Sequence, residues 1–191
     1  MTKNINKKIA ILAIITTLTA FQANAETLVD KNVAQQQRIE EGLKSGNLNT
    51  KEAARLEKGE AQIDKAEAHA MKDGSVSPQE AERIKHLQEA ESKRIYKEKH
   101  DVQKGNPNSV SSKRMQEDVQ RNVNQQQRID NGVKNGSLSG HEAAALEKGQ
   151  AKESRREYRA GRNGRIGAGE QNKIQNTDNN QSKKIYDDKH D

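Results

Sequence analysis

Apolar side chains recur along the chain at the spacing of an α-helix, separated by polar and charged residues. Positions three, four or seven residues apart share one face of a helix, whereas a strand alternates. The apolar positions of the first half are Val33, Ile39, Leu43, Leu56, Ile63, Ala66, Met71, Ile84, Leu87 and Ile95. The pattern predicts helices over residues 32–44, 50–72, 78–99, 120–134, 140–160 and 168–188.

The apolar stripes on these helices are narrow, because hydrophobic residues make up 30% of the chain and aromatic residues 2%. So small a core predicts modest stability, or a partner that completes it. Residues 175–181, QNTDNNQ, are rich in poor helix formers, so the last helix is expected to be marginal or frayed.

An internal repeat organises the chain. Residues 31–61 match residues 121–151 at 19 of 31 positions, and the same offset of 90 places residues 92–101 on residues 182–191. Self-similarity at a fixed offset is the signature of a duplicated structural unit. The predicted fold is all-α, a tandem duplication of a three-helix unit built from helix-loop-helix hairpins.

The predicted domains follow from this repeat. The first unit covers residues 26–101 and the second covers residues 119–191. Between them, residues 102–118 contain Gly105, Pro107 and a cluster of serines, a composition typical of a flexible linker.

Four helix junctions share a motif in which a glycine is followed by an apolar residue two positions later and a glutamate six positions later. The motif occurs at Gly46, Leu48 and Glu52; at Gly74, Val76 and Glu80; at Gly136, Leu138 and Glu142; and at Gly164, Ile166 and Glu170. These are positions 6, 8 and 12 of a calcium-binding EF-hand loop. The motif also fits helix capping, with the glycine ending one helix and the glutamate closing the capping box of the next.

Calcium binding by these loops is the weaker of the two interpretations. Its candidate ligands are Glu41, Ser45 and Glu52 in the first loop and Asp73, Ser77 and Glu80 in the second. The third position of each loop, which normally supplies a ligand, is Leu43, Met71, Val133 or Gly161. Capping requires only residues that are present, and it is therefore preferred.

The two loops of each unit are also too close in sequence to form a pair of EF-hands. Gly46 and Gly74 are 28 residues apart, so one continuous helix is expected between them. Gly59, and Gly149 in the second unit, are the positions at which that helix could break, although one interior glycine costs only about 1 kcal/mol.

The first 25 residues predict a secretory signal peptide. Lys3, Lys7 and Lys8 precede an apolar run over residues 9–21, and Ala-Asn-Ala at residues 23–25 fits a cleavage site. The rival interpretation, a transmembrane anchor, needs roughly 20 apolar residues. The chain has no cysteine, so neither a lipid anchor nor a disulfide is expected. The predicted location is the periplasm, with secretion as an alternative.

Removal of residues 1–25 changes the charge of the chain. The full chain carries 34 basic and 28 acidic residues, and three of the lysines lie in the signal peptide. The remaining excess is small, so no nucleic-acid partner is predicted.

One basic cluster stands out in the second unit. It consists of Arg155, Arg156, Arg159, Arg162 and Arg165. The cluster is either a solvated surface or a binding patch for an anion such as lipopolysaccharide or an acidic envelope protein.

No pattern in the chain indicates catalysis. HEAAA at residues 141–145 lacks the second histidine of a zinc-protease motif, and GRNGRIGAG at residues 161–169 lacks the Lys-Ser/Thr ending of a phosphate-binding loop. The prediction is a non-enzymatic protein without a cofactor, apart from calcium in the alternative interpretation.

The segments QQQRI, EAARLEKG and IYKEKHD, with their counterparts in the second unit, resemble small exported proteobacterial proteins of unknown function with degenerate EF-hand-like junctions. That resemblance implies export and helical repeats, and it implies no activity. The predicted function is a helical binding or structural protein of the cell envelope.

Overall fold

The computed structural model describes residues 28–191, and all regular secondary structure in that range is helical. The predicted signal peptide lies outside the described residues. The helices are residues 28–45, α2 (Thr50–Ala70), α3 (Pro78–Lys99), α4 (Val110–Lys134), α5 (Gly140–Gly161) and α6 (Ala168–Asp188). The all-α prediction is confirmed.

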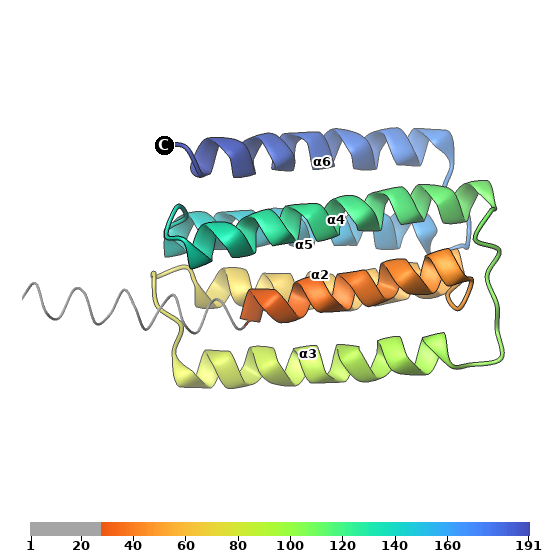
Figure 1. Ribbon diagram of the computed structural model, residues 1–191, viewed down its shortest axis with the longest axis horizontal. Coiled ribbons are helices and arrows are strands. Elements are labelled where there is room, and N and C mark those ends of the chain that lie inside the picture. The colour runs from red at the N-terminus through yellow and green to blue at the C-terminus, as the bar shows by residue number, and fades with distance from the viewer. Residues whose placement is uncertain (1–27) are drawn as a thin grey trace, which may run out of the picture.

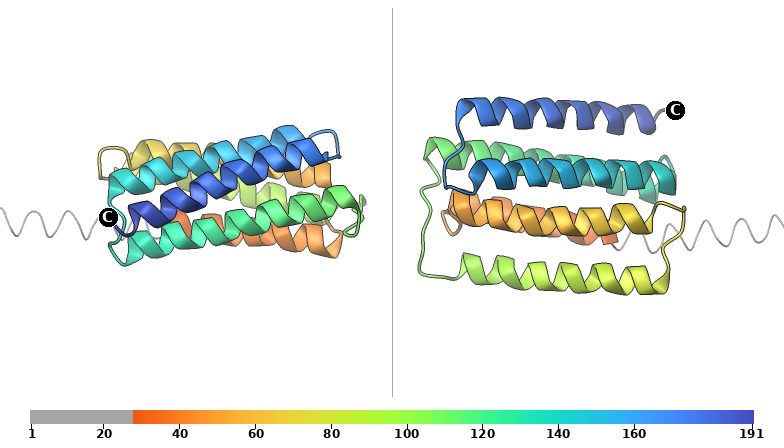
Figure 2. Two further views of the ribbon diagram at one scale, coloured as in Figure 1. Left: turned by 90° about the horizontal axis from the view of Figure 1, so that it is seen from above. Right: turned by 180° about the vertical axis from the view of Figure 1, so that it is seen from behind.

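The six helices lie roughly along one axis in a single bundle (Figure 1). The helix over residues 28–45, α2, α4 and α5 form the centre, and α3 and α6 flank it on opposite sides (Figure 2). This arrangement gives the central helices neighbours on most sides, so their buried faces are wide.

Among helices α2 to α6, the most extensive contact joins α2 to α5 and thus the two halves of the sequence. The helices run antiparallel, because Gly161 at the end of α5 lies against Thr50 and Ala54 at the start of α2. A Cβ at Gly161 would lie 2.8 Å from the Ala54 Cβ, so the glycine allows this close approach. The two halves therefore share one core.

Helix caps form at the predicted junctions. The side chains of Asn49, Ser77 and Ser139 accept hydrogen bonds from the first turns of α2, α3 and α5, and the glutamate three positions later completes each capping box. At the start of α6 the cap residue is Gly167, which has no side chain to accept a bond, and its backbone N–H donates to Glu170 Oε2 at 2.8 Å. The preceding glycines have positive φ, at Gly46, Gly74, Gly136 and Gly164. The capping prediction is confirmed.

Helix α4 begins about ten residues earlier than the sequence pattern indicated. Ser109 accepts a hydrogen bond from the Ser112 N–H and starts the helix, so residues 110–118 are helical rather than linker. Met115 and Val119 are fully buried. The serines that suggested a linker are instead the cap and first turn of the helix.

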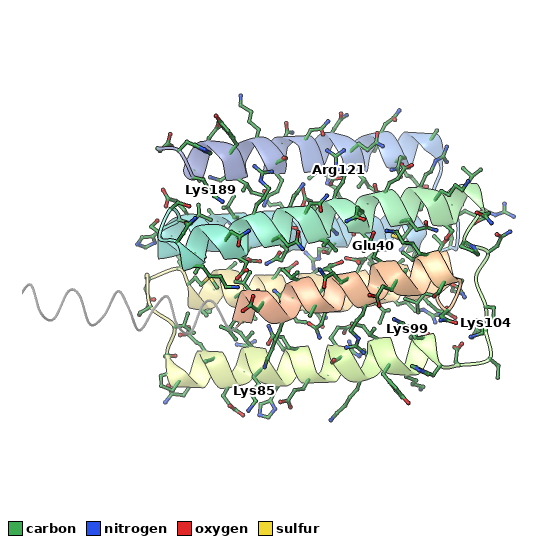
Figure 3. All side chains as sticks on the ribbon, viewed as in Figure 1. Glu40, Lys85, Lys99, Lys104, Arg121 and Lys189 are labelled. Carbon is green, nitrogen blue, oxygen red and sulfur yellow. The ribbon has the colours of Figure 1, made fainter. Side chains whose placement is uncertain are left out.

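The connection between α3 and α4 is held against the first loop. Gly105 N–H donates to the Gly46 carbonyl at 2.9 Å, and Lys104 Nζ donates to Asn47 Oδ1 at 3.1 Å. Figure 3 shows Lys104 on this connection, at the end of the bundle. These bonds give residues 102–109 a fixed path over the first loop.

Helix α6 is continuous through residues 175–181, so the expectation of a frayed helix is wrong. Asp178 and Gln181 lie on its buried face, and Gln181 Nε2 donates to the Leu146 carbonyl at 2.8 Å. Tertiary contacts therefore outweigh the poor intrinsic propensity of this segment.

The core contains almost as many polar as apolar side chains. Among residues 28–191, 28 apolar side chains and 26 polar or charged side chains are buried. The apolar clusters gather toward the ends of the bundle, around Met71 and Val133 at one end and around Leu43 and Met115 at the other. The polar side chains occupy the middle of α2 and α5 and the faces turned toward them.

The same hydrogen bonds recur in the two halves at an offset of 90 residues. They are Asn32 to Glu67 and Asn122 to Glu157; Gln36 to Glu57 and Gln126 to Glu147; and Arg38 to Ser92 and Arg128 to Ser182. Each joins the first helix of a half to its second or third helix.

Gly59 and Gly149 do not break their helices. A Cβ at Gly59 would lie 1.9 Å from the Glu91 carboxyl group, and one at Gly149 would lie 2.0 Å from the Gln181 amide. Each glycine makes room for a polar side chain of the flanking helix, which the sequence pattern did not reveal.

We expect Gly105→Ala to destabilise the protein by about 1–3 kcal/mol, the usual cost of overpacking. The added Cβ would lie 2.4 Å from the Leu48 carbonyl oxygen and 2.9 Å from the Asn49 Cα, and backbone atoms move less readily than side chains. Gly169→Ala, in the first turn of α6 with open space around it, is the control and should be neutral or stabilising. Urea unfolding measures both, and equal midpoints would contradict the close packing of this connection.

Candidate functional site

A basic groove runs between the outer faces of α2 and α5. Its volume is about 700 Å³. The residues that line this basic groove are Lys58, Ala61, Gln62, Lys65, Ala68, His69, Lys72, Lys148, Ala151, Lys152, Arg155, Tyr158 and Arg159.

The lining of the basic groove carries charge of one sign. Seven of its residues are lysine or arginine, and none is aspartate or glutamate. Like charges gathered in one groove repel each other and attract an anion, which neutralises several of them at once. The arrangement is therefore suited to an elongated anionic ligand.

Helical periodicity places these cations in line. Lys58 and Lys65 on α2 and Lys72, in the turn just past its end, recur every seven residues and span about 20 Å at roughly 1.5 Å per residue. On α5, Lys148 and Arg155 are seven residues apart, and so are Lys152 and Arg159. The acidic residues of both helices, apart from the capping residue Glu142, lie on the buried face.

Tyr158 is the one tyrosine, phenylalanine or tryptophan in the lining. The ammonium group of Lys58 lies 5.4 Å from its ring centroid, within the range of a cation–π contact. The ring thus joins the α2 and α5 walls of the groove and offers an apolar face next to the charges.

The structure brings together two residues of the predicted arginine cluster. Arg155 and Arg159 line the basic groove, whereas Arg156, Arg162 and Arg165 are exposed outside its lining. Lys58, Lys65 and Lys72 also line the groove, and the sequence alone did not connect them with the arginine cluster because they lie in the other half of the chain. Their spacing of seven was visible in the sequence.

The candidate calcium ligands of the first loop have other contacts. The Glu41 carboxylate lies 3.6 Å from Lys99 Nζ, and the Ser45 hydroxyl donates to the Gly42 carbonyl at 3.2 Å. Glu52 Oε2 accepts from the Asn49 N–H at 2.9 Å.

Glu52 also lies close to two acidic residues at the end of α3. One carboxylate oxygen each from Glu52, Glu98 and Asp101 lies within 4.8 Å of the others. Burial raises the pKa of Glu52, and the charges of Asp101 and Glu98 add to this.

The candidates of the second loop likewise serve its local structure. Asp73 Oδ1 accepts from the Ser75 N–H and hydroxyl, and these bonds lower the pKa of Asp73. Glu80 Oε2 accepts from the Ser77 N–H at 3.0 Å and from the Ser77 hydroxyl at 2.7 Å.

A belt of buried carboxyl groups crosses the middle of the bundle. The carboxylate belt consists of Glu57, Glu60, Asp64, Glu67, Glu91, Asp118, Glu147, Glu153, Glu157 and Asp178. Burial is the largest cause of a raised pKa for every member. Burial disfavours the charged form, so these groups hold protons at a higher pH than usual.

Repulsion between neighbouring carboxylates of the belt raises the pKa of some members further. Burial and the neighbouring Asp178 raise the pKa of Asp118 to about 8, and burial raises that of Asp178 to about 6 against the opposing charge of Arg121. Arg121 Nε lies 3.5 Å from Asp178 Oδ2, and Figure 3 shows Arg121 between α4 and α6.

Sequence reasoning missed the carboxylate belt, because charged residues are usually solvated. The available signal was periodicity. Glu57, Glu60, Asp64 and Glu67 follow a helical spacing that continues the stripe of Leu56 and Ile63.

Comparisons with protein families, with curated proteins and with solved structures found no match to this chain. Within residues 28–191, none of the helices combines the length and the apolar character needed to cross a membrane.

We expect the free energy of unfolding to fall as the pH rises from about 5 to 8. Burial raises the pKa of Glu67 and Glu91 from the ordinary 4.5 to about 7. Between these values the folded state holds more protons than the unfolded state, so each such carboxyl removes up to about 1.4 kcal/mol per pH unit. Urea unfolding at several pH values, with a chelator present, measures the slope.

Glu91→Gln is the matched variant for this slope, because Gln181 occupies the equivalent position beside Gly149. It should flatten the pH dependence and leave the protein more stable at pH 8 than the wild type. Stability that increases from pH 5 to 8 in the wild type would show that these carboxyls are ionised without cost.

Proposed function

We propose that this protein is an exported, non-enzymatic protein of the cell envelope, periplasmic or secreted, that binds an anionic envelope component through the basic groove. The observation that carries the proposal is the lining of seven cations without an acidic residue. Phosphate and carboxylate groups on a glycolipid or polysaccharide match the guanidinium and ammonium groups of such a lining.

The spread of the cations along the groove supports an extended ligand rather than a single small ion. The cations are distributed over about 20 Å of helix, so a ligand must carry several anionic groups along its length to neutralise them. Lipopolysaccharide, with phosphates and acidic sugars, has this character and would be accessible to an exported protein.

The proposal includes a tandem duplication of a three-helix unit. It is supported by the sequence repeat and by the hydrogen bonds that recur at the same offset of 90 residues. Duplication provides two versions of one helix, α2 and α5, and the groove lies between them.

We expect binding to heparin and to lipopolysaccharide, both weakening as the salt concentration rises. Arg155→Gln combined with Arg159→Gln should weaken binding at low salt on the order of tenfold, since two charge-assisted contacts are lost. Heparin chromatography and titration with lipopolysaccharide micelles measure the change.

Arg162→Gln combined with Arg165→Gln is the control, because it removes the same charge from the neighbouring segment outside the groove. This pair should bind almost as the wild type does. Equal losses in both double variants would show a general effect of net charge, and tighter binding to duplex DNA than to lipopolysaccharide would contradict an envelope ligand.

A further inference from the structure

Three members of the carboxylate belt meet at the interface of α2 and α5. Asp64 and Glu67 come from α2 and Glu147 from α5, and one carboxylate oxygen of each lies within 4.8 Å of the others. All three are buried, with Asp64 4% exposed and the other two fully enclosed. The site therefore joins the two halves of the chain inside the core.

When these three carboxyl groups are ionised, no described basic side chain supplies a counter-charge. Within residues 28–191, no basic side chain forms an ion pair with any of the three. Glu147 Oε2 is buried without a hydrogen-bond partner in the same range, and so are both carboxyl oxygens of the adjacent Glu60. A buried carboxylate without a counter-charge is strongly unfavourable, so a proton or a cation must neutralise it.

Amide groups from the surrounding helices hold the carboxylates in place. Asn32 Nδ2 donates to Glu67 Oε2 at 2.5 Å, and Gln88 Nε2 donates to Glu67 Oε1 at 3.1 Å. Gln126 Nε2 donates to Glu147 Oε1 at 2.8 Å. Donors on both oxygens of Glu67 favour its ionised form, and such outer hydrogen bonds orient the ligands of metal sites.

We propose that Asp64, Glu67 and Glu147 bind one hard divalent cation, Mg²⁺, Mn²⁺ or Ca²⁺, in the core of the bundle. These ions prefer oxygen ligands, and no nitrogen or sulfur ligand belongs to the cluster. Oxygens bound at about 2.1–2.5 Å from one ion lie about 3–5 Å apart, which matches the spacing here. Facing helices of bundles commonly supply metal ligands in this way.

The equivalent position in the other half differs at one of the three residues. An offset of 90 residues maps Asp64, Glu67 and Glu147 onto Ser154, Glu157 and Glu57. Ser154 stands there in place of Asp64, and Glu57 Oε2 accepts a hydrogen bond from Gln36 Nε2 at 3.1 Å. Among the described residues, this position therefore has two carboxyl groups and one hydroxyl where the other has three carboxyl groups.

Calorimetric titration of the metal-stripped protein with MgCl₂, MnCl₂ and CaCl₂ in turn, at pH 7.5, tests the site. We expect one ion per chain for at least one of the three salts, with protons released on binding and an increase in melting temperature. Proton release is measured by repeating the titration in buffers of different ionisation enthalpy. The absence of saturable binding for all three salts would overturn the proposal.

Asp64→Ser is the decisive variant, because serine already occupies the equivalent position at residue 154. It should weaken binding at least a hundredfold and remain folded by circular dichroism. Glu80→Gln changes the loop that resembles an EF-hand, and Glu153→Gln removes a buried carboxyl outside the cluster. Both should bind as the wild type does. Binding that survives Asp64→Ser, or is lost in Glu80→Gln, would contradict this location.

The reverse change tests the same inference by gain of binding. Ser154→Asp supplies the missing third carboxylate beside Glu57 and Glu157, so the folded variant should bind two ions per chain. A stoichiometry of one in that folded variant would contradict the assignment of the site to three carboxylates. Combining Ser154→Asp with Asp64→Ser should return the stoichiometry to one, with the ion moved to the second position.

Discussion

The structure depends on how α2 and α5 bury acidic side chains where they cross. An isolated carboxylate in a protein interior costs several kcal/mol, yet the middle of both helices presents carboxyl groups inward. Protons, amide donors and a cation are the three ways to neutralise such groups, and the surrounding helices supply the amides. The first helix of each half donates amide hydrogen bonds to the buried glutamates of α2 and α5, through Asn32, Gln36, Asn122 and Gln126. These two helices are therefore needed to stabilise the buried carboxyl groups.

The same two helices separate charge between their faces. Most of their acidic residues face inward, and most of their basic residues face outward and line the basic groove. On each helix, these acidic and basic residues lie on opposite sides. A cation that neutralises the buried carboxylates would therefore leave the outward lysines and arginines with less negative charge nearby. The interior and the groove are thereby electrostatically related, although no residue belongs to both.

Local features of the chain were readable from the sequence, and long-range ones were not. Ser77, Glu80 and Gly74 specify a junction through bonds between neighbouring residues, so the caps at these junctions followed directly from the sequence. The start of α4 did not, because it depends on burial of Met115 and Val119. The pairing of α2 with α5 depends on which helix faces meet in space. About half of the buried side chains on these faces are polar, so counting apolar positions underestimates the width of the buried faces. Arg155 and Arg159 were found as part of a run, whereas their partners on α2 lie about 90 residues away.

The antiparallel crossing of α2 and α5 gives the bundle an approximate two-fold axis, like that of a symmetric dimer. In a dimer of identical chains, any substitution appears on both sides of the axis at once. Here the two sides are covalently joined and can differ: residue 64 is Asp and residue 154 is Ser, residue 68 is Ala and residue 158 is Tyr. One chain can therefore carry different side chains on the two faces of the α2–α5 interface, whereas a symmetric dimer of identical chains cannot.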